Sequence, residues 1–127
     1  MQYEDLGLFT RGYVEALLWT ECEVGPDFDP KNGSPLPQGA TFEDFAPETV
    51  TQIIVDCASF EMANKRLLSE CGDDVQNGHD FWLTRNGHGA GFWDRGYGKA
   101  GELVSDKARA FKEVSVYLGD DGKIYLS

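Results

Sequence analysis

The first apolar stripe along the chain has the period of a helix. Within residues 6–23, Leu6, Phe9, Tyr13 and Leu17 recur at three- and four-residue steps, which predicts an amphipathic helix with one face in a core. Residues 24–40 follow with four prolines and three glycines, a composition that predicts a loop.

The strongest helical pattern opens at Pro47, a residue favoured in the first turn of a helix. Its apolar residues also recur at three- and four-residue steps: Val50, Ile53, Ile54, Cys57, Phe60, Leu67, Leu68 and Cys71. Gly72 follows directly and suits a helix end. The sequence therefore predicts one long helix over residues 47–71, followed by a loop over residues 73–78.

From residue 79 the pattern favours strands. Residues 79–84 and 89–94 are rich in aromatic residues and flank Asn86-Gly87, a dipeptide that favours the tight turn of a β-hairpin. A two-residue turn at this dipeptide would pair His79 with Asp94 across the two strands. We therefore predict a first hairpin here.

The last third of the chain predicts one more helix and a second hairpin. Apolar periodicity indicates a helix over residues 99–111, and residues 114–118 and 123–126 read as strands joined by a glycine-bounded turn. The expected fold class is α+β, with an antiparallel sheet of two β-hairpins packed with three helices in the order α-α-β-β-α-β-β. We expect residues 1–127 to form a single domain.

The first hairpin also determines the candidate surface residues. Alternation along its strands would place Trp82 and Trp93 on one face. That face is either an exposed interaction surface or core beneath a sheet covered on both sides. His79, Asp94 and Arg95 lie at the open end of the same hairpin and complete the candidate partner-binding set.

The net charge of −11 is concentrated in one part of the chain. The acidic helical part, residues 1–78, holds fifteen acidic and four basic residues, whereas residues 79–127 hold seven of each. This field disfavours direct binding to nucleic acid and favours a basic partner, including one that itself binds nucleic acid; it also aids solubility.

The sequence predicts no metal ion and no cofactor. On the expected hairpin, His79 and His88 would lie roughly 20 Å apart, too far to share a zinc ion. Residues 27–38 resemble a calcium loop but lack glycine at its sixth position and glutamate at its twelfth. Residues 96–101 match a dinucleotide-binding glycine pattern without the repeated βαβ units that such a site needs.

The three cysteines, Cys22, Cys57 and Cys71, are expected to be free thiols in a reducing compartment. The odd number of cysteines favours this interpretation, as does the absence of a basic-then-apolar secretory pattern at residues 1–5. No apolar run is long enough to suggest a membrane span.

Two segments carry a resemblance. Residues 78–95 read Gly-His-Asp-Phe-Trp-Leu-Thr-Arg-Asn-Gly-His-Gly-Ala-Gly-Phe-Trp-Asp-Arg, and residues 117–125 read Tyr-Leu-Gly-Asp-Asp-Gly-Lys-Ile-Tyr. Together they resemble a family of small uncharacterised proteins of tailed bacteriophages, with a looser similarity at residues 45–49. The resemblance implies a phage-encoded protein that acts in the bacterial host cytoplasm, accessory to the virion rather than part of it. It implies no activity or ligand.

We therefore expect a non-enzymatic phage accessory protein that binds a host protein and modulates or inhibits it. An anti-defence role by DNA mimicry, with carboxylates in place of phosphates, is one form of this hypothesis. One alternative is a small enzyme that uses the His79–Asp94 pair, with Asp80 or Arg95 beside it; a surface salt link is the simpler interpretation of that pair. The other alternative is a minor structural or assembly protein.

Overall fold

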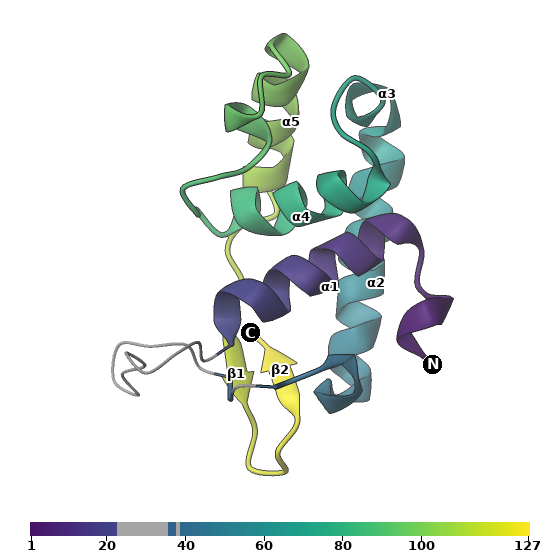
Figure 1. Ribbon diagram of the computed structural model, residues 1–127, viewed down its shortest axis with the longest axis vertical. Coiled ribbons are helices and arrows are strands. Elements are labelled where there is room, and N and C mark those ends of the chain that lie inside the picture. Colours follow the sequence, from purple (N-terminus) through teal and green to yellow (C-terminus); the bar gives the residue numbers. More distant parts are fainter. Residues whose placement is uncertain (23–35, 38) are drawn as a thin grey trace.

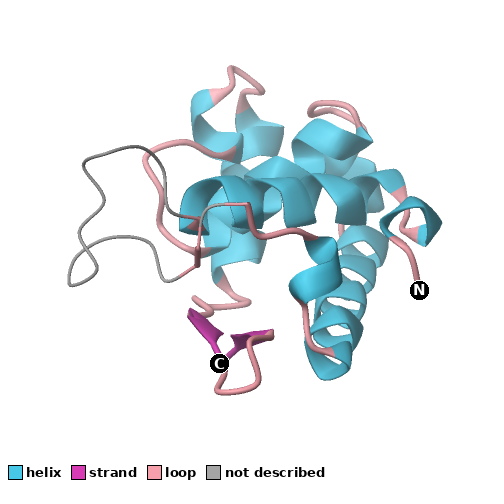
Figure 2. Ribbon diagram, turned by 60° about the horizontal axis from the view of Figure 1, so that its bottom comes forward, coloured by secondary structure: helices cyan, strands magenta, loops and turns pink. Residues whose placement is uncertain are grey.

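The computed structural model describes residues 1–22, 36–37 and 39–127. Helices make up most of this part of the chain, and a small antiparallel sheet lies at one edge (Figures 1 and 2). The helices are α1 (Leu8–Glu21), α2 (Pro47–Ala63), α3 (Lys65–Leu68), α4 (Asp74–Arg85) and α5 (Lys99–Arg109). The 3₁₀ turns are η1 (Tyr3–Asp5), η2 (Phe42–Asp44) and η3 (Phe92–Asp94), and the strands are β1 (Val116–Leu118) and β2 (Ile124–Leu126). The predicted loop over residues 24–40 and its calcium-like segment lie largely outside the described residues.

Helices α1 and α4 lie side by side across the middle of the molecule (Figure 1). Two glycines let their backbones meet. A β-carbon on Gly78 would collide with the carbonyl oxygen of Phe9, and a β-carbon on Gly12 would collide with the carbonyl oxygen of Val75. Because each carbonyl belongs to the opposite helix, only glycine at both positions permits this close approach.

Aromatic side chains fill the core around this contact. The rings of Phe60 and Phe81 stack with their centroids 4.0 Å apart, which joins α2 to α4. Tyr13 of α1 packs edge-on against Trp82 of α4 at 5.3 Å. All four side chains are fully buried, so this cluster holds three helices together.

The predicted first hairpin is wrong. Residues 74–85 form α4, with Asp73 as the N-cap whose carboxylate accepts a hydrogen bond from the Gln76 amide. The helix ends at Arg85 with Asn86 as its C-cap, and Gly87 follows with a φ of +69°, so Asn86-Gly87 closes a helix instead of turning a hairpin. The second expected strand, residues 89–94, is instead a loop that runs into η3.

The long predicted helix over residues 47–71 is interrupted. It begins at Pro47 as expected, but α2 ends at Ala63 and the short α3 follows. At the break, Asn64 has non-helical backbone angles, and its side-chain amide donates to the carbonyl of Phe60. This local hydrogen bond competes with the helical pattern, as asparagine side chains commonly do.

The end of the chain follows the prediction. Helix α5 lies within the predicted residues 99–111, and β1 pairs with β2 so that Val116 faces Leu126 and Leu118 faces Ile124. Thr49 of α2 donates its hydroxyl to the carbonyl of Ile124, which fixes this hairpin against the helices. The fold class is thus α+β, but with a single hairpin in the described residues. None of the described helices is both long and apolar enough to cross a membrane.

Replacement of Gly78 by alanine should lower the free energy of unfolding by roughly 3 kcal/mol, because the new methyl group forces α1 and α4 apart. The measurement is urea unfolding followed by circular dichroism. Gly89→Ala is the matched control, since Gly89 faces open space and should change stability by less than about 0.5 kcal/mol. Equal effects of the two substitutions would contradict the close helix contact.

Candidate interaction surface

His79 pairs with a different carboxylate from the one expected. It lies in α4, and its Nε2 is 3.0 Å from Oε2 of Glu15 on α1. The hydroxyl of Tyr3 donates to the other oxygen of Glu15 at 2.7 Å. The hydrogen bonds from His79 and Tyr3 lower the pKa of Glu15, whereas burial and the bond to Glu15 raise the pKa of Tyr3 to about 12. The predicted cross-strand pairing of His79 with Asp94 is therefore wrong.

Asp94 and Arg95 make contacts that support the local fold. The Asp94 carboxylate accepts a hydrogen bond from the Gly91 amide at 2.9 Å and so begins η3. Arg95 donates through Nε and Nη2 to one oxygen of the fully buried Asp80 at 3.1 and 3.0 Å. Burial raises the pKa of Asp80, although its bonds to Arg95 and Gln76 act in the opposite direction.

Arg85 joins three parts of the molecule. Its buried guanidinium donates to the hydroxyl of Tyr13 and forms an ion pair with Asp56 of α2 at 3.0 Å. It also donates to the carbonyls of Phe111 and Lys112, which follow α5. The guanidinium is held by α1, α2 and the end of α5, so its charge is used for structure.

Two more polar residues of the segment 78–95 are also committed to the fold. The hydroxyl of Thr84 accepts a hydrogen bond from the Phe92 amide at 3.1 Å. The Asn86 side chain donates to the carbonyl of Trp82 and accepts from the Val114 amide. The segment that carries the phage resemblance is therefore, for most of its length, the junction between α4, η3 and the end of α5.

The tryptophans differ sharply in exposure. Trp82 is fully buried, and its indole N–H donates to Thr20 at 2.8 Å, so it cannot belong to an exposed surface. Trp93 in η3 is 47% exposed, and Trp19 on α1 is 70% exposed. Trp19 was not a predicted site residue. Its position outside the apolar stripe of α1 could have indicated that its side chain is exposed.

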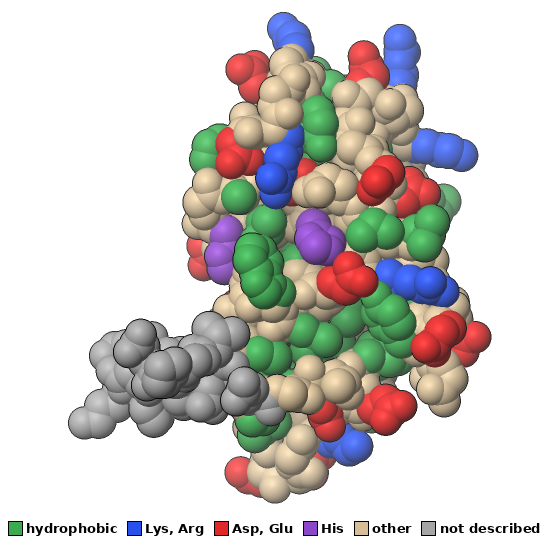
Figure 3. Space-filling model, in the orientation of Figure 1, with side chains coloured by type: hydrophobic (Ala, Val, Ile, Leu, Met, Phe, Trp, Pro, Cys, Tyr) green, Lys and Arg blue, Asp and Glu red, His purple; other side chains and the backbone are tan. Residues whose placement is uncertain are grey.

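Trp19 lies on α1 one helical turn beyond Glu15, and Glu15 lines an apolar hollow. The hollow has a volume of about 410 Å³ and lies between α1, η1 and the chain at residues 40–43. Leu18, Val14 and Phe42 contribute apolar lining, and Glu15 lies at its edge. Figure 3 shows hydrophobic side chains gathered below α1, with acidic side chains around them.

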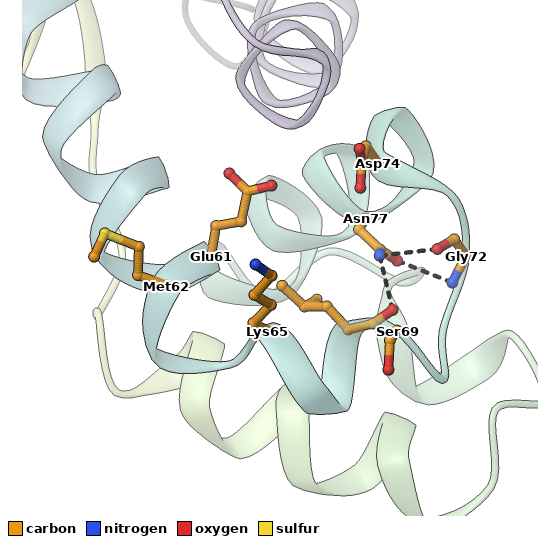
Figure 4. A pocket seen from close by; sticks show the side chains of 8 residues that line it. Glu61, Met62, Lys65, Ser69, Gly72, Asp74 and Asn77 are labelled. Carbon is orange, nitrogen blue, oxygen red and sulfur yellow. Dashed lines mark hydrogen bonds between the residues drawn. The ribbon is translucent and has the colours of Figure 1, made fainter.

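A second cavity lies elsewhere, between the end of α2, α3 and the start of α4 (Figure 4). It has a volume of about 430 Å³ and is lined in part by Glu61, Lys65 and Asp74. Burial and the nearby charge of Asp74 raise the pKa of Glu61, and Lys65 acts against them. The side chain of Asn77 lies at its wall. Its amide nitrogen donates to the carbonyls of Leu68 and Gly72, and its amide oxygen accepts a hydrogen bond from the Gly72 amide. The cavity thus has both acidic and basic side chains in its lining, while its Asn77 side chain is engaged within the fold.

Within the part of the chain that the structure describes, the histidines and acidic residues do not assemble a metal centre. Both histidines of the chain appear on the face shown in Figure 3. His88 lines a hollow of about 290 Å³ together with Glu21 and Glu113. No three or more His, Cys, Asp or Glu side chains converge to hold a metal ion anywhere in residues 1–22, 36–37 and 39–127.

The cysteines are free thiols with raised pKa values. Cys57 is buried, and Cys22 and Cys71 are partly exposed. Burial is the main cause of the raised pKa in each case. Because the thiolate is the nucleophilic form, none of the three has the environment of an activated cysteine.

Comparison with known proteins finds no match for this chain. No protein-family model, no curated protein and no solved structure matches the chain. The phage resemblance stays an expectation from the sequence of residues 78–95 and 117–125, with the looser similarity at residues 45–49.

Replacement of Arg85 by methionine should cost roughly 3–5 kcal/mol in the free energy of unfolding, because it leaves Asp56 without its partner and frees two carbonyls. Thermal or urea unfolding measures this loss. Arg109→Met provides the comparison, since the pair of Arg109 with Asp106 is exposed and should contribute less than about 1 kcal/mol. A loss at Arg85 no larger than at Arg109 would refute the structural role.

The three indoles should also separate in fluorescence quenching. A variant with Trp19→Phe and Trp93→Phe retains only Trp82, whose emission should lie at short wavelength and resist acrylamide. The wild-type protein should show a large additional component that acrylamide quenches readily. Comparable quenching of both proteins would mean that Trp82 is accessible and that the assigned burial is wrong.

Proposed function

We propose that the protein is a non-enzymatic accessory protein of a tailed bacteriophage that binds a host protein in the bacterial cytoplasm and modulates or inhibits it. The observation that carries this proposal is the 70% exposure of Trp19, one helical turn from Glu15, a residue that lines an apolar hollow. Large exposed aromatic side chains are costly to leave in water and are enriched at the centres of protein interfaces.

The chemistry of the remaining residues favours binding over catalysis. The His79–Glu15 pair can orient an imidazole, but Glu15 is the one hydrogen-bond partner of His79 in the described part of the chain. The thiols have raised pKa values, and the charges of Arg85 and Asp80 are used inside the fold. These residues offer no assembled nucleophile and base.

The charge of the protein favours a basic partner. The net charge is −11, and the acidic excess lies in residues 1–78, which include α1 and α2. A host protein that binds nucleic acid through a basic surface has the complementary field. In the DNA-mimicry form of the proposal, carboxylates on this part of the chain occupy the positions of phosphates in such a surface.

Capture from a bacterial lysate tests the proposal. The immobilised wild-type protein should retain a specific host protein, more strongly at low salt than at high salt. Trp19→Ser should lose it because the exposed indole is removed. Leu103→Ser should keep it, since Leu103 is an exposed apolar residue on α5, away from α1 in the sequence. Retention of no protein at either salt concentration, or equal retention by Trp19→Ser, would overturn the proposal.

A further inference from the structure

Two neighbouring hollows meet at Phe42, and we propose that together they bind a basic segment of the partner that carries two apolar side chains. This inference rests on the proposed function and assigns its binding site. The first hollow, of about 410 Å³, lies on the α1 side. The second, of about 330 Å³, lies on the α2 side and is lined by Phe45, Val50 and Ile54. Phe42 and Glu43 line both, so the two hollows are adjacent at η2, and the pair is called the groove below.

The floor of this groove is fixed before any partner arrives. The Phe42 ring stands edge-on to Tyr3 at 6.0 Å and to Phe45 at 5.8 Å. The Thr41 amide donates to the Asp44 carboxylate at 2.8 Å, which closes the turn that presents Phe42. The Ala46 amide donates a hydrogen bond to the carbonyl of Ile124, so β2 also holds the residues that follow this turn. A preformed groove avoids much of the ordering cost of binding.

The size and lining of the groove suit two side chains of one segment. Each hollow has a volume near the lower end of the roughly 300–1,000 Å³ typical of binding pockets. Leu18 and Val14 line the first, and Val50 and Ile54, one helical turn apart, line the second. Apolar anchors from one peptide element commonly fill such adjacent pockets.

The charges around the groove select a basic segment. The four elements that line it, η1, α1, η2 and α2, hold nine acidic residues and one basic residue, Arg11. Two of the acidic residues, Glu15 and Glu43, line the hollows themselves, whereas Asp56 is paired with Arg85 and Glu61 lines a separate cavity. Arg11 is itself engaged, because its guanidinium donates to the carbonyls of Leu6 and Glu4 and lies over the Tyr3 ring. An acidic segment would be repelled, whereas lysine or arginine side chains next to the anchors would meet Glu43 and Glu15.

Trp19 extends the site at one end. It lies on α1 outside the lining of the first hollow, one helical turn after the lining residue Glu15. An exposed indole is the best aromatic acceptor for a lysine or arginine cation. Trp19 therefore suits a basic side chain that follows the anchor in the first hollow.

Three synthetic peptides test the site on the full-length protein by calorimetry and by methyl NMR. The first carries two leucines among lysines and arginines, the second has serines in place of the leucines, and the third has glutamates in place of the bases. The first should bind and shift the methyl signals of Val14, Leu18, Val50 and Ile54. The second should bind at least about tenfold more weakly, and the third should not bind.

Two charge-reversal variants locate the contact. Glu43→Lys should weaken the first peptide by about tenfold or more, since Glu43 borders both hollows. Glu102→Lys makes the same charge change on α5 and should leave affinity within about threefold.

Equal binding of the leucine and serine peptides would overturn the groove and favour a purely electrostatic mimic of nucleic acid. Failure of the first peptide to bind, or methyl shifts away from the groove, would also overturn it. If host-protein capture still depends on Trp19 in either case, the proposed function stands and only the groove assignment fails. Loss of both results would remove the proposed function as well.

Discussion

The contact between α1 and α4 determines how the other parts of the molecule are placed. Gly12 and Gly78 remove the side chains that would separate the two backbones, so the helices meet at their carbonyls. This approach brings Tyr13 against Trp82 and lets the indole reach Thr20. It also brings His79 to Glu15 at the surface. The same contact that buries one tryptophan leaves the outer side of α1, with Trp19, facing solvent.

The sequence predicted the elements whose pattern had one interpretation. Helix α1, the start of α2, helix α5 and the final hairpin each have a single clear period or turn. The segment that became α4 did not, because Phe81, Trp82 and Leu83 are all buried and aromatic residues favour strands as readily as a packed helix. Two features favour a helix over a strand here. Asp73 and Gln76 stand at the N-cap and at the third helical position, and Gly87 follows the helix in the left-handed conformation. Asn86-Gly87 fits a hairpin turn equally well when the sequence is read alone.

The candidate site was harder to predict than the fold. Once the hairpin is replaced by a helix, His79 and Asp94 no longer face each other, and Trp82 moves into the core. The groove at Phe42 is built from two stretches that lie apart in the sequence, residues 1–18 and 40–54, so no single local pattern marks it. The acidic excess of residues 1–78 was visible in the sequence, and the structure adds that the elements lining the groove lie within that part of the chain.

Nuclear Overhauser effects between backbone protons test the central contact most directly. The helix pair predicts strong effects between the α-protons of Gly12 and Val75 and between the α-protons of Gly78 and the amide proton of Tyr13, together with sequential amide–amide effects through residues 74–85. Effects between the α-protons of opposite residues along 79–84 and 89–94, with no contact between the two glycines and the facing helix, would contradict the account.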